Sequence, residues 1–359
     1  MLLDNIMGNI VDYINEYGDK GFDEVPFNEV DGLVLSQFVY LKWENVVPKL
    51  TDDAEGITLT DMQEKMQAAE VFSYEAYRAD NMKLWNAMVN SKRFGEMKCN
   101  YLSEMLDTVS ETQFLAFAVF PKNALPVVLF RGTDETILGW KEDYNMAFTM
   151  PVTGQRMAKL YLGQVALRIE GDFYVAGHSK GGNLSIYAGL SSDKPVQDRI
   201  AGIYNYDGPH LRPEVIKDFD ETAVYDRHHK YIPYDSFFGI MLETNHHYMV
   251  CDSTANRGVF QHYPYTWKVD GTHFVYKKKP TKRSLRLNER VTEAFMTLTN
   301  EQIVFVSDLL FGGFAREDVE TTSELQRELK KTAKNAIQEM GSLSSEQKKQ
   351  LFEVVKEFV

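Results

Sequence analysis

A serine between glycines lies near the middle of the chain, in the segment Gly177-His178-Ser179-Lys180-Gly181. The spacing Gly-x-Ser-x-Gly is that of a nucleophile elbow, whose sharp turn exposes the serine and leaves almost no room for side chains two residues before and after it. The β-prone run 173–176 precedes the segment, and helix formers with apolar residues at helical spacing follow at 183–190. This context predicts Ser179 as a nucleophile. The alternative is a glycine-rich loop with an incidental serine.

A serine hydroxyl is a weak nucleophile, so it needs an imidazole to take its proton and a carboxylate to orient that imidazole. All eight histidines lie at or after position 178. We predict His262 as the base, because it lies in a loop after the last expected sheet strand, where an α/β-hydrolase needs its base. Asp235 is the preferred acid because it follows the penultimate strand, and Asp207, which follows the strand before that one, is the alternative.

The elements that must position these residues begin at about residue 111, where the chain becomes rich in β-formers. Apolar runs at 114–120 and 126–131 predict a hairpin. Further strands are expected at 173–176, 201–206, 230–232 and 247–251. Strands that alternate with helices after an initial hairpin predict a mostly parallel central sheet flanked by helices, with α/β-hydrolase topology. In such sheets functional residues follow the carboxyl ends of strands, which is where these four fall: Thr133, Ser179, Asp207 and Asp235.

The rest of the chain is expected to be mainly helical. Residues 1–109 form a mostly helical N-terminal region packed on the core, in which Asn28 is placed to cap a helix over 30–43. The α/β-hydrolase catalytic core spans 110–276. Residues 277–359 form a C-terminal helical region that is either separate or part of the same domain, and the basic run at its start is expected to be a solvated connection.

Composition excludes several classes of function. With 39 Lys and Arg against 52 Asp and Glu, the net charge of -13 repels nucleic acid and anionic lipid surfaces. No apolar run of eighteen residues and no signal peptide is present, so we expect a cytoplasmic protein without integral membrane contact. The two cysteines, Cys99 and Cys251, form no metal or redox motif. We expect no cofactor and no metal, and a small-molecule or lipid ester fits best as substrate. The sequence predicts no particular oligomeric state.

Several motifs together resemble known lipases. Phe130-Arg131-Gly132-Thr133, then Trp140 and Asp143 at W-x-x-D spacing, then residues 177–182, resemble the oxyanion strand and elbow of the class 3 (fungal type) lipases. From about residue 20 to 275 the chain more closely resembles an uncharacterised bacterial lipase-like α/β-hydrolase family of unknown function. The segments that carry this second resemblance are Pro26-Phe27-Asn28-Glu29-Val30-Asp31, Phe130 to Asp134, Gly139-Trp140-Lys141-Glu142-Asp143, Gly177 to Asn183, Asp207-Gly208-Pro209, and Gln261-His262 with Trp267.

The lipase resemblance implies an oxyanion hole. Thr133 would supply a backbone N–H and a hydroxyl, Lys180 would supply the second N–H, and Asp143 would hold the Thr133 hydroxyl. The chain departs from the lipase pattern at Lys180, where leucine is usual, and its ammonium would alter substrate choice or pair with an acid. It departs again at Lys230, which occupies the position of the lipase acid, so the acid would have moved to Asp235 or Asp207.

These observations lead to the hypothesis of a cytoplasmic serine hydrolase that cleaves a carboxylic ester through an acyl-enzyme on Ser179. A thioesterase, acyltransferase or peptidase would use the same triad. An alternative from another class is a non-catalytic binding protein with the α/β-hydrolase fold. The loop 135–151, which carries Met146 and Met150, or the C-terminal helices, would be positioned to cover the site as a lid.

Overall fold

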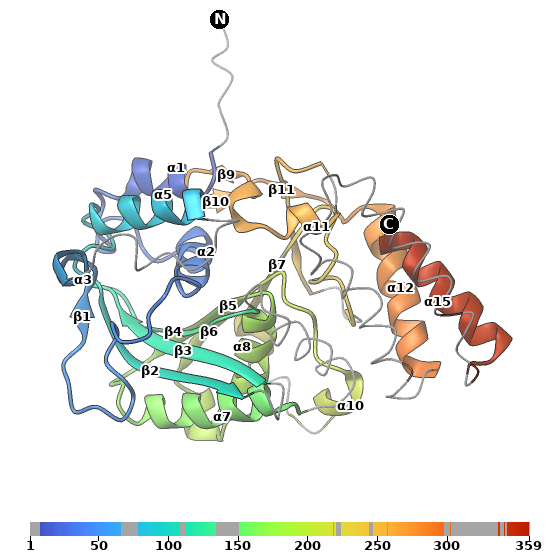
Figure 1. The fold of residues 1–359 in the computed structure, drawn as a ribbon. Helices are drawn as coiled ribbons and strands as arrows, with labels where there is room; N and C mark the ends of the chain where they lie inside the picture. Colours follow the sequence, from blue (N-terminus) through green and yellow to red (C-terminus); the bar gives the residue numbers. More distant parts are fainter. Residues whose placement is uncertain are drawn as a thin grey trace, which may run out of the picture.

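A nine-stranded sheet forms the centre of the molecule (Figure 1). The computed structural model describes residues 8–65, 78–107, 112–133, 151–217, 219, 224–243, 247–256, 258–297, 302, 337, 341 and 343–358. In sheet order, the strands are β1 (Ile57–Thr58), β2 (Lys98–Asp107), β3 (Thr112–Phe120), β4 (Val127–Phe130), β5 (Phe173–His178), β6 (Ile200–Tyr206), β7 (His228–Pro233), β8 (Met249–Cys251) and β11 (Tyr276–Lys277).

The parallel part of the sheet is confined to its middle. Strands β4, β5, β6, β7 and β8 run parallel to one another. Adjacent strands from β1 to β4 pair antiparallel, and β11 pairs antiparallel with β8. The register places His178 opposite Tyr206, and Tyr206 opposite Tyr231, so the strands β5, β6 and β7 end side by side. The prediction of a mixed α/β protein with a large central sheet is confirmed, with antiparallel strands added on both sides of the parallel strands.

Helices cover both faces of the sheet. Helix α2 (Glu29–Phe38), backed by α1 (Ile10–Tyr17) and α5 (Arg78–Val89), lies on one face, and α7 (Thr153–Ala166) and α8 (Lys180–Ser191) lie on the other (Figure 1). The remaining elements are α3 (Leu59–Lys65), α9 (Lys194–Gln197), α10 (Pro213–Ile216), α11 (Gly258–Gln261), α12 (Lys282–Thr297), α15 (Ser345–Phe358), the 3-10 turns η2 (Tyr225–Arg227) and η3 (Pro264–Thr266), and a small hairpin of β9 (Val269–Asp270) and β10 (His273–Phe274). None of the described helices is both long enough and apolar enough to cross a membrane.

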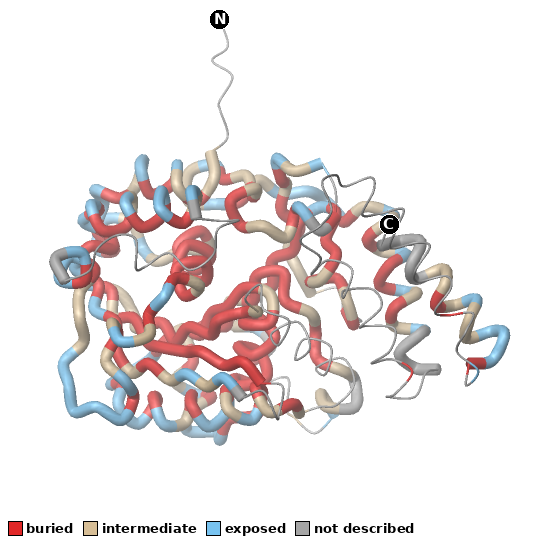
Figure 2. Tube along the Cα trace, viewed as in Figure 1, coloured by how far each residue is buried: buried red, intermediate tan, exposed pale blue. Residues whose placement is uncertain are grey.

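Strand β3 shows why the central strands are apolar throughout. Successive side chains of a strand point to opposite faces. Phe117 and Val119 therefore join the core under α2, whereas Ala116 and Ala118 join the core under α7 and α8. Because helices cover both faces, both sets must be apolar. The result is the buried centre of the sheet in Figure 2, whereas the outer strands β2 and β11, the outer helices and the turns carry exposed residues.

The N-terminal region differs from the expectation of mainly helix at its end. Residues 98–107 form β2, which pairs along β3 and buries Cys99 and Leu102. Leucine and methionine at spacings compatible with either helix or strand leave this segment ambiguous in sequence, and the neighbouring strand decides it. Asn28 caps α2 as predicted, since its side chain accepts the Val30 N–H at 3.0 Å. The helix ends at Phe38, whose carbonyl accepts the indole N–H of Trp43.

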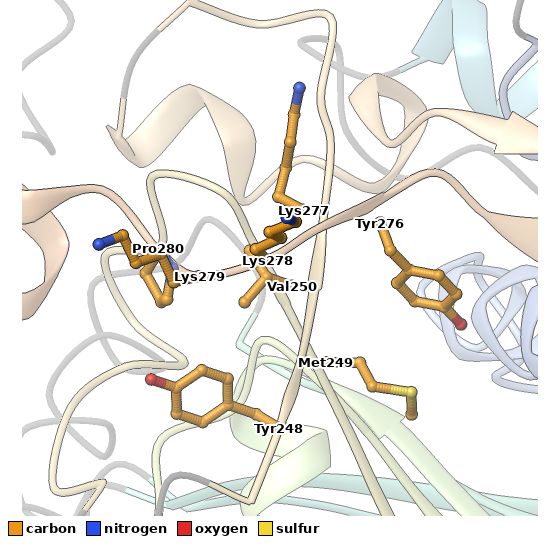
Figure 3. A pocket seen from close by; sticks show the side chains of 8 residues that line it. All are labelled: Tyr248, Met249, Val250, Tyr276, Lys277, Lys278, Lys279 and Pro280. Carbon is orange, nitrogen blue, oxygen red and sulfur yellow. The ribbon is translucent and has the colours of Figure 1, made fainter.

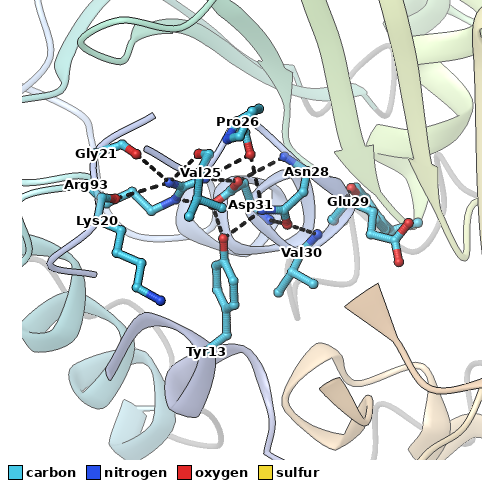
Figure 4. A network of polar contacts seen from close by, with 11 residues as sticks. Tyr13, Lys20, Gly21, Val25, Pro26, Asn28, Glu29, Val30, Asp31 and Arg93 are labelled. Atoms are coloured by element: carbon cyan, nitrogen blue, oxygen red, sulfur yellow. Dashed lines mark hydrogen bonds and ion pairs between the residues drawn. The ribbon is translucent and has the colours of Figure 1, made fainter. Parts of the chain in front are cut away.

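A buried polar network joins α2 to the segment after α5 (Figure 4). The guanidinium of Arg93 donates to Asp31 from Nε at 2.7 Å, and both side chains are fully buried. Tyr13 donates to the same carboxylate at 2.9 Å, and Arg93 also donates to the carbonyl of Val25 at 2.9 Å. Every charge here has a partner, which a buried charge requires. The network therefore joins α2 to α1, to the segment before α2 and to the segment after α5.

Candidate active site

Ser179 lies at the turn between β5 and α8, in a backbone conformation that few residues adopt. Its φ of 57° and ψ of -128° depart from the allowed regions for ordinary L-residues. Its N–H donates to the carbonyl of Tyr206 at 2.9 Å, and its carbonyl accepts the N–H of Gly182 at 2.9 Å. The side chain is half-buried at the carboxyl end of β5. Strain of this kind is typical of functional sites, where the surrounding structure maintains it.

The glycines around Ser179 are required by close backbone contacts, as the spacing predicted. A Cβ on Gly177 would lie 2.2 Å from the backbone carbon of Gly181, and a Cβ on Gly181 would lie 2.1 Å from the carbonyl oxygen of Phe130. Real Cβ atoms do not approach backbone atoms so closely. These contacts bring the end of β4, the end of β5 and the start of α8 together at one point.

Asp207 and His262 form a hydrogen-bonded pair next to this turn. Asp207 follows β6, with φ of 50°, and its side chain is fully buried. His262 Nδ1 lies 2.6 Å from Asp207 Oδ2, and the imidazole remains 19% exposed. The other carboxylate oxygen accepts the hydroxyl of Ser236 at 2.6 Å and the N–H of Gly239 at 3.0 Å. The carboxylate is thus held by three donors from two different loops.

Asp235, the preferred acid in the sequence analysis, is engaged elsewhere. Its Oδ2 accepts the N–H of Gly258 at 2.8 Å and the guanidinium of Arg283 at 3.1 Å, and its Oδ1 accepts the hydroxyl of Thr281. These contacts do not include His262, whose imidazole contacts Asp207, the alternative acid of the sequence analysis. The carboxylate of Asp235 instead fastens the start of α11 to the segment that enters α12.

The residues expected to form the oxyanion hole start from the end of β4. Phe130 pairs with Gly177 in parallel register, and a Cβ on Gly132 would lie 2.7 Å from the carbonyl oxygen of His178. Thr133, half-buried, follows directly and is the last residue described before the loop. Lys180 is the first residue of α8. Asp143 and the expected lid residues of the loop 135–150 lie outside the described residues.

Both departures from the lipase pattern are buried lysines with definite contacts. Lys180 Nζ donates to the carbonyl of Gln113 in β3 at 2.9 Å, and the side chain is buried away from solvent. Lys230 forms an ion pair with Glu243 at 2.8 Å, and both side chains are fully buried. Neither contact involves Ser179, Asp207 or His262.

Two aromatic side chains beside His262, and a third that contacts one of them, were not identified as site residues from the sequence. The rings of His178 and Phe238 each lie with their centroids 4.4 Å from the ring of His262. Nε2 of His178 lies 2.9 Å from the carbonyl oxygen of His262, and the hydroxyl of Tyr40 lies 3.2 Å from Nδ1 of His178. Tyr40 is 138 residues from its partner in the chain, and no motif of the sequence links the two.

A separate pocket of about 370 Å³ lies beside strands β8 and β11, on the outer side of the sheet (Figure 3). It is lined by Tyr248, Met249, Val250, Tyr276, Lys277, Lys278, Lys279 and Pro280, and includes no residue of the pair or the elbow. Lys277 pairs with Asp252 at 3.2 Å. In Figure 3 the ammonium groups of Lys277 and Lys279 point in different directions. The basic run 277–279 thus forms part of the lining of this pocket.

Among the described residues, no three His, Cys, Asp or Glu side chains are grouped so as to hold a metal ion. Both cysteines are buried free thiols, and burial raises the pKa of Cys251 well above its ordinary value. The ends of β5 and β6 carry a hydroxyl from Ser179 and a carboxylate from Asp207, and the imidazole of His262 contacts that carboxylate.

Comparison with protein families identifies one family that matches the chain. A family model described as Mbeg1-like matches residues 88–312, more than half of the chain. The chain belongs to the Mbeg1-like family. The Mbeg1-like family is lipase-like, and its model spans the elbow and the Asp207–His262 pair. It begins after the Pro26 to Asp31 segment, which the sequence resemblance had included. Searches among curated proteins and solved structures found no match.

Proposed function

We propose that this Mbeg1-like protein is a serine hydrolase of the α/β-hydrolase fold, which cleaves a carboxylic ester through an acyl-enzyme on Ser179. The observation that carries the proposal is the 2.6 Å contact between His262 Nδ1 and Asp207 Oδ2, beside a serine at a strained strand-to-helix turn. The chain order of nucleophile, acid and base is that of the α/β-hydrolases, and the run of parallel strands β4 to β8 supports this fold.

Asp207 is the proposed acid of the triad. A carboxylate only accepts hydrogen bonds, so its contact with His262 requires the proton on Nδ1. In the neutral ring Nε2 is then free of a proton and acts as the base for Ser179. The bonds from Ser236 and Gly239 to the other carboxylate oxygen keep the carboxylate turned to His262.

The reaction begins when Ser179 Oγ attacks the ester carbonyl carbon while its proton passes to Nε2 of His262. The bond to the leaving alcohol then breaks, and the alcohol takes that proton. Water attacks the acyl-enzyme with His262 again as the base, which releases the acid and restores the serine. Asp207 stabilises the imidazolium that forms in each half of the reaction.

The developing oxyanion is proposed to bind at the N-terminus of α8. The N–H of Lys180 and the N–H and hydroxyl of Thr133 are the expected donors. Two observations support this placement: Lys180 begins a twelve-residue helix, and the strand before Thr133 is in contact with the elbow through Gly132 and Gly181. The positive end of the helix dipole adds to the stabilisation of negative charge there.

An apolar side chain lies beside the base. Phe238 is half-buried against His262, and Phe260, at the end of α11, is 55% exposed. The ring of Phe238 favours an ester with an apolar acyl or alcohol group over a highly charged substrate. A thioesterase, acyltransferase or peptidase remains an alternative with the same triad, and a binding protein is the alternative without catalysis.

Hydrolysis of p-nitrophenyl esters of increasing acyl length tests the proposal, together with labelling by a fluorophosphonate. Native protein is expected to be active and labelled, and Ser179→Ala to be neither. Ser192→Ala is the matched control, because that hydroxyl only bonds the carbonyl of Ala188 at the end of the same helix. Absence of labelling in folded native protein would favour the binding protein. Labelling without ester hydrolysis would indicate a different acyl substrate.

A further inference from the structure

His178 contacts parts of the site that lie far apart in the chain. The residue precedes Ser179 and is 5% exposed. Its Nε2 lies 2.9 Å from the main-chain oxygen of His262, and its Nδ1 lies 3.2 Å from the hydroxyl of Tyr40. Its ring faces the ring of His262 with centroids 4.4 Å apart. The residue therefore links the nucleophile turn to the loop that carries the proposed base.

The partners of His178 determine its tautomer. A carbonyl oxygen only accepts hydrogen bonds, so Nε2 of His178 carries a proton and donates it to His262. Burial, with a smaller effect of the nearby His262, holds the pKa of His178 well below its ordinary value, so the ring is neutral. Nδ1 therefore has a lone pair, which accepts the hydroxyl proton of Tyr40. Each ring nitrogen has one partner that matches its role.

We propose that His178 is a positioning residue for His262, and that it sets the distance between the proposed base and Ser179. The inference rests on the proposed function of this site. His262 is held by its side chain through Asp207 and by its main chain through His178. Two anchors on opposite parts of one residue restrict both translation and rotation of the imidazole, which a single anchor would not do.

The neutral state of His178 suits this role. His262 becomes positively charged when it takes the proton of Ser179. A second charge on a ring with its centroid only 4.4 Å away would oppose that step, and a neutral His178 avoids the repulsion. His178 thus supports the base through a hydrogen bond and ring packing without competing with it for a proton.

Tyr40 extends the same arrangement to the oxyanion strand. A Cβ on Gly132 would lie 1.9 Å from the Tyr40 hydroxyl, so this hydroxyl lies directly against the backbone before Thr133. Tyr40 follows α2, which the Arg93–Asp31 pair anchors. The N-terminal region therefore contacts the elbow and the oxyanion strand through one hydroxyl.

Three substitutions of His178 separate the hydrogen bond from simple packing. His178→Phe keeps a ring and removes the donor. His178→Asn keeps an amide donor that is too short to reach the carbonyl of His262, whereas the longer amide of His178→Gln reaches about the position of Nε2. We expect fluorophosphonate labelling of Ser179 to slow roughly 10- to 100-fold in the Phe and Asn variants and to recover in the Gln variant. His229→Phe is the control, because His229 packs on Tyr204 away from the site.

Proton NMR supplies a readout that does not depend on activity. The Nδ1 proton of His262, in a short hydrogen bond to Asp207, gives a resonance far downfield, which Asp207→Asn removes. We expect His178→Phe and His178→Asn to shift or broaden it, and His178→Gln to preserve it, with all variants folded by circular dichroism. If native protein is not labelled, the proposed function fails, and this resonance still tests His178. Unchanged resonance and labelling in the Asn variant, or equal losses in Asn and Gln variants, would overturn the inference.

Discussion

The Nδ1 atom of His262 lies 2.6 Å from Oδ2 of Asp207, although 55 residues separate them in the chain. Ser179 follows His178, and Asp207 follows Tyr206. His178 and Tyr206 are directly opposite each other in neighbouring parallel strands. The carboxylate and the serine are therefore fixed to the same edge of the sheet, and the imidazole reaches that edge from a loop. The predictions below concern this edge and the contacts that stabilise it.

Replacement of the proposed acid tests the triad most directly. Asp207→Asn keeps the shape of the side chain but favours the wrong tautomer of His262, so turnover should fall on the order of 10⁴-fold. Asp235→Asn should retain most activity, because its carboxylate contacts Gly258 and Arg283 instead. Steady-state hydrolysis of the best p-nitrophenyl ester measures both. A larger loss in the Asp235 variant would restore Asp235 as the acid.

Removal of the Thr133 hydroxyl tests the oxyanion hole. Thr133→Ala retains the backbone N–H and loses one donor, so turnover should fall roughly 10²- to 10³-fold while the fold is kept. The ratio of turnover between native and variant protein measures this loss, and the thermal midpoint shows whether the fold is intact. A folded variant with native turnover would remove Thr133 from the site.

A pair of glycine substitutions tests the close approach at the elbow. Gly181→Ala places a Cβ 2.1 Å from the carbonyl oxygen of Phe130 and should lower the free energy of unfolding by roughly 1–3 kcal/mol or more. Gly163→Ala in α7 meets no atom within 4 Å and should raise it by about 0.5–1 kcal/mol. Urea denaturation of the two variants gives both values. If the two substitutions changed the free energy of unfolding by the same amount, the close contact between Gly181 and Phe130 would be contradicted.

Buried histidines should make the protein sensitive to acid. Burial lowers the pKa of His228 well below its ordinary value, and burial with the nearby Lys230 lowers that of His210. The unfolded chain binds these protons near pH 6.5, whereas the folded chain resists them until a lower pH. The contribution of these neutral histidines to stability should therefore be fully present above about pH 6.5 and should decrease as the pH falls below it.

Urea denaturation between pH 5 and 8, compared with His228→Phe, measures this dependence. The variant should show a weaker loss of stability on the acid side, because one proton uptake on unfolding is removed. Nε2 of His228 has no hydrogen-bond partner among the described residues, so the substitution breaks no such bond at that atom. An unchanged slope would show that His228 does not contribute to the acid sensitivity.

Removal of one partner from the buried ion pair of the N-terminal region should destabilise the folded protein strongly. Arg93→Met leaves the carboxylate of Asp31 buried without its cation and should lower the free energy of unfolding by about 3–5 kcal/mol. Lys92→Met removes the neighbouring exposed pair with Glu24 and should change stability little. Thermal unfolding of the two variants compares them. Similarly small decreases in the thermal midpoint of the two variants would contradict the burial of Arg93.

Local features of the chain were predictable because neighbouring residues determine them. The elbow around Ser179 needs glycines two positions away, and the structure contains the backbone contacts that require them. Asn28 caps α2 through donors two and three residues away. The segment 98–107 was less predictable, since its pattern of apolar residues fits two periodicities and the pairing with β3 selects the strand.

By itself, the sequence determined the glycine-flanked turn at Ser179. It also predicted His262 as a base from its loop position and offered two candidate acids at the ends of successive strands. Only the tertiary structure distinguished Asp207 from Asp235. Both follow parallel strands, so spacing treats them alike, and the difference arises from the loops that Ser236, Gly239 and Gly258 bring to one carboxylate or the other. Only the tertiary structure brings His178 into contact with His262 and Tyr40, because contacts across 84 and 138 residues depend on the packing of whole elements.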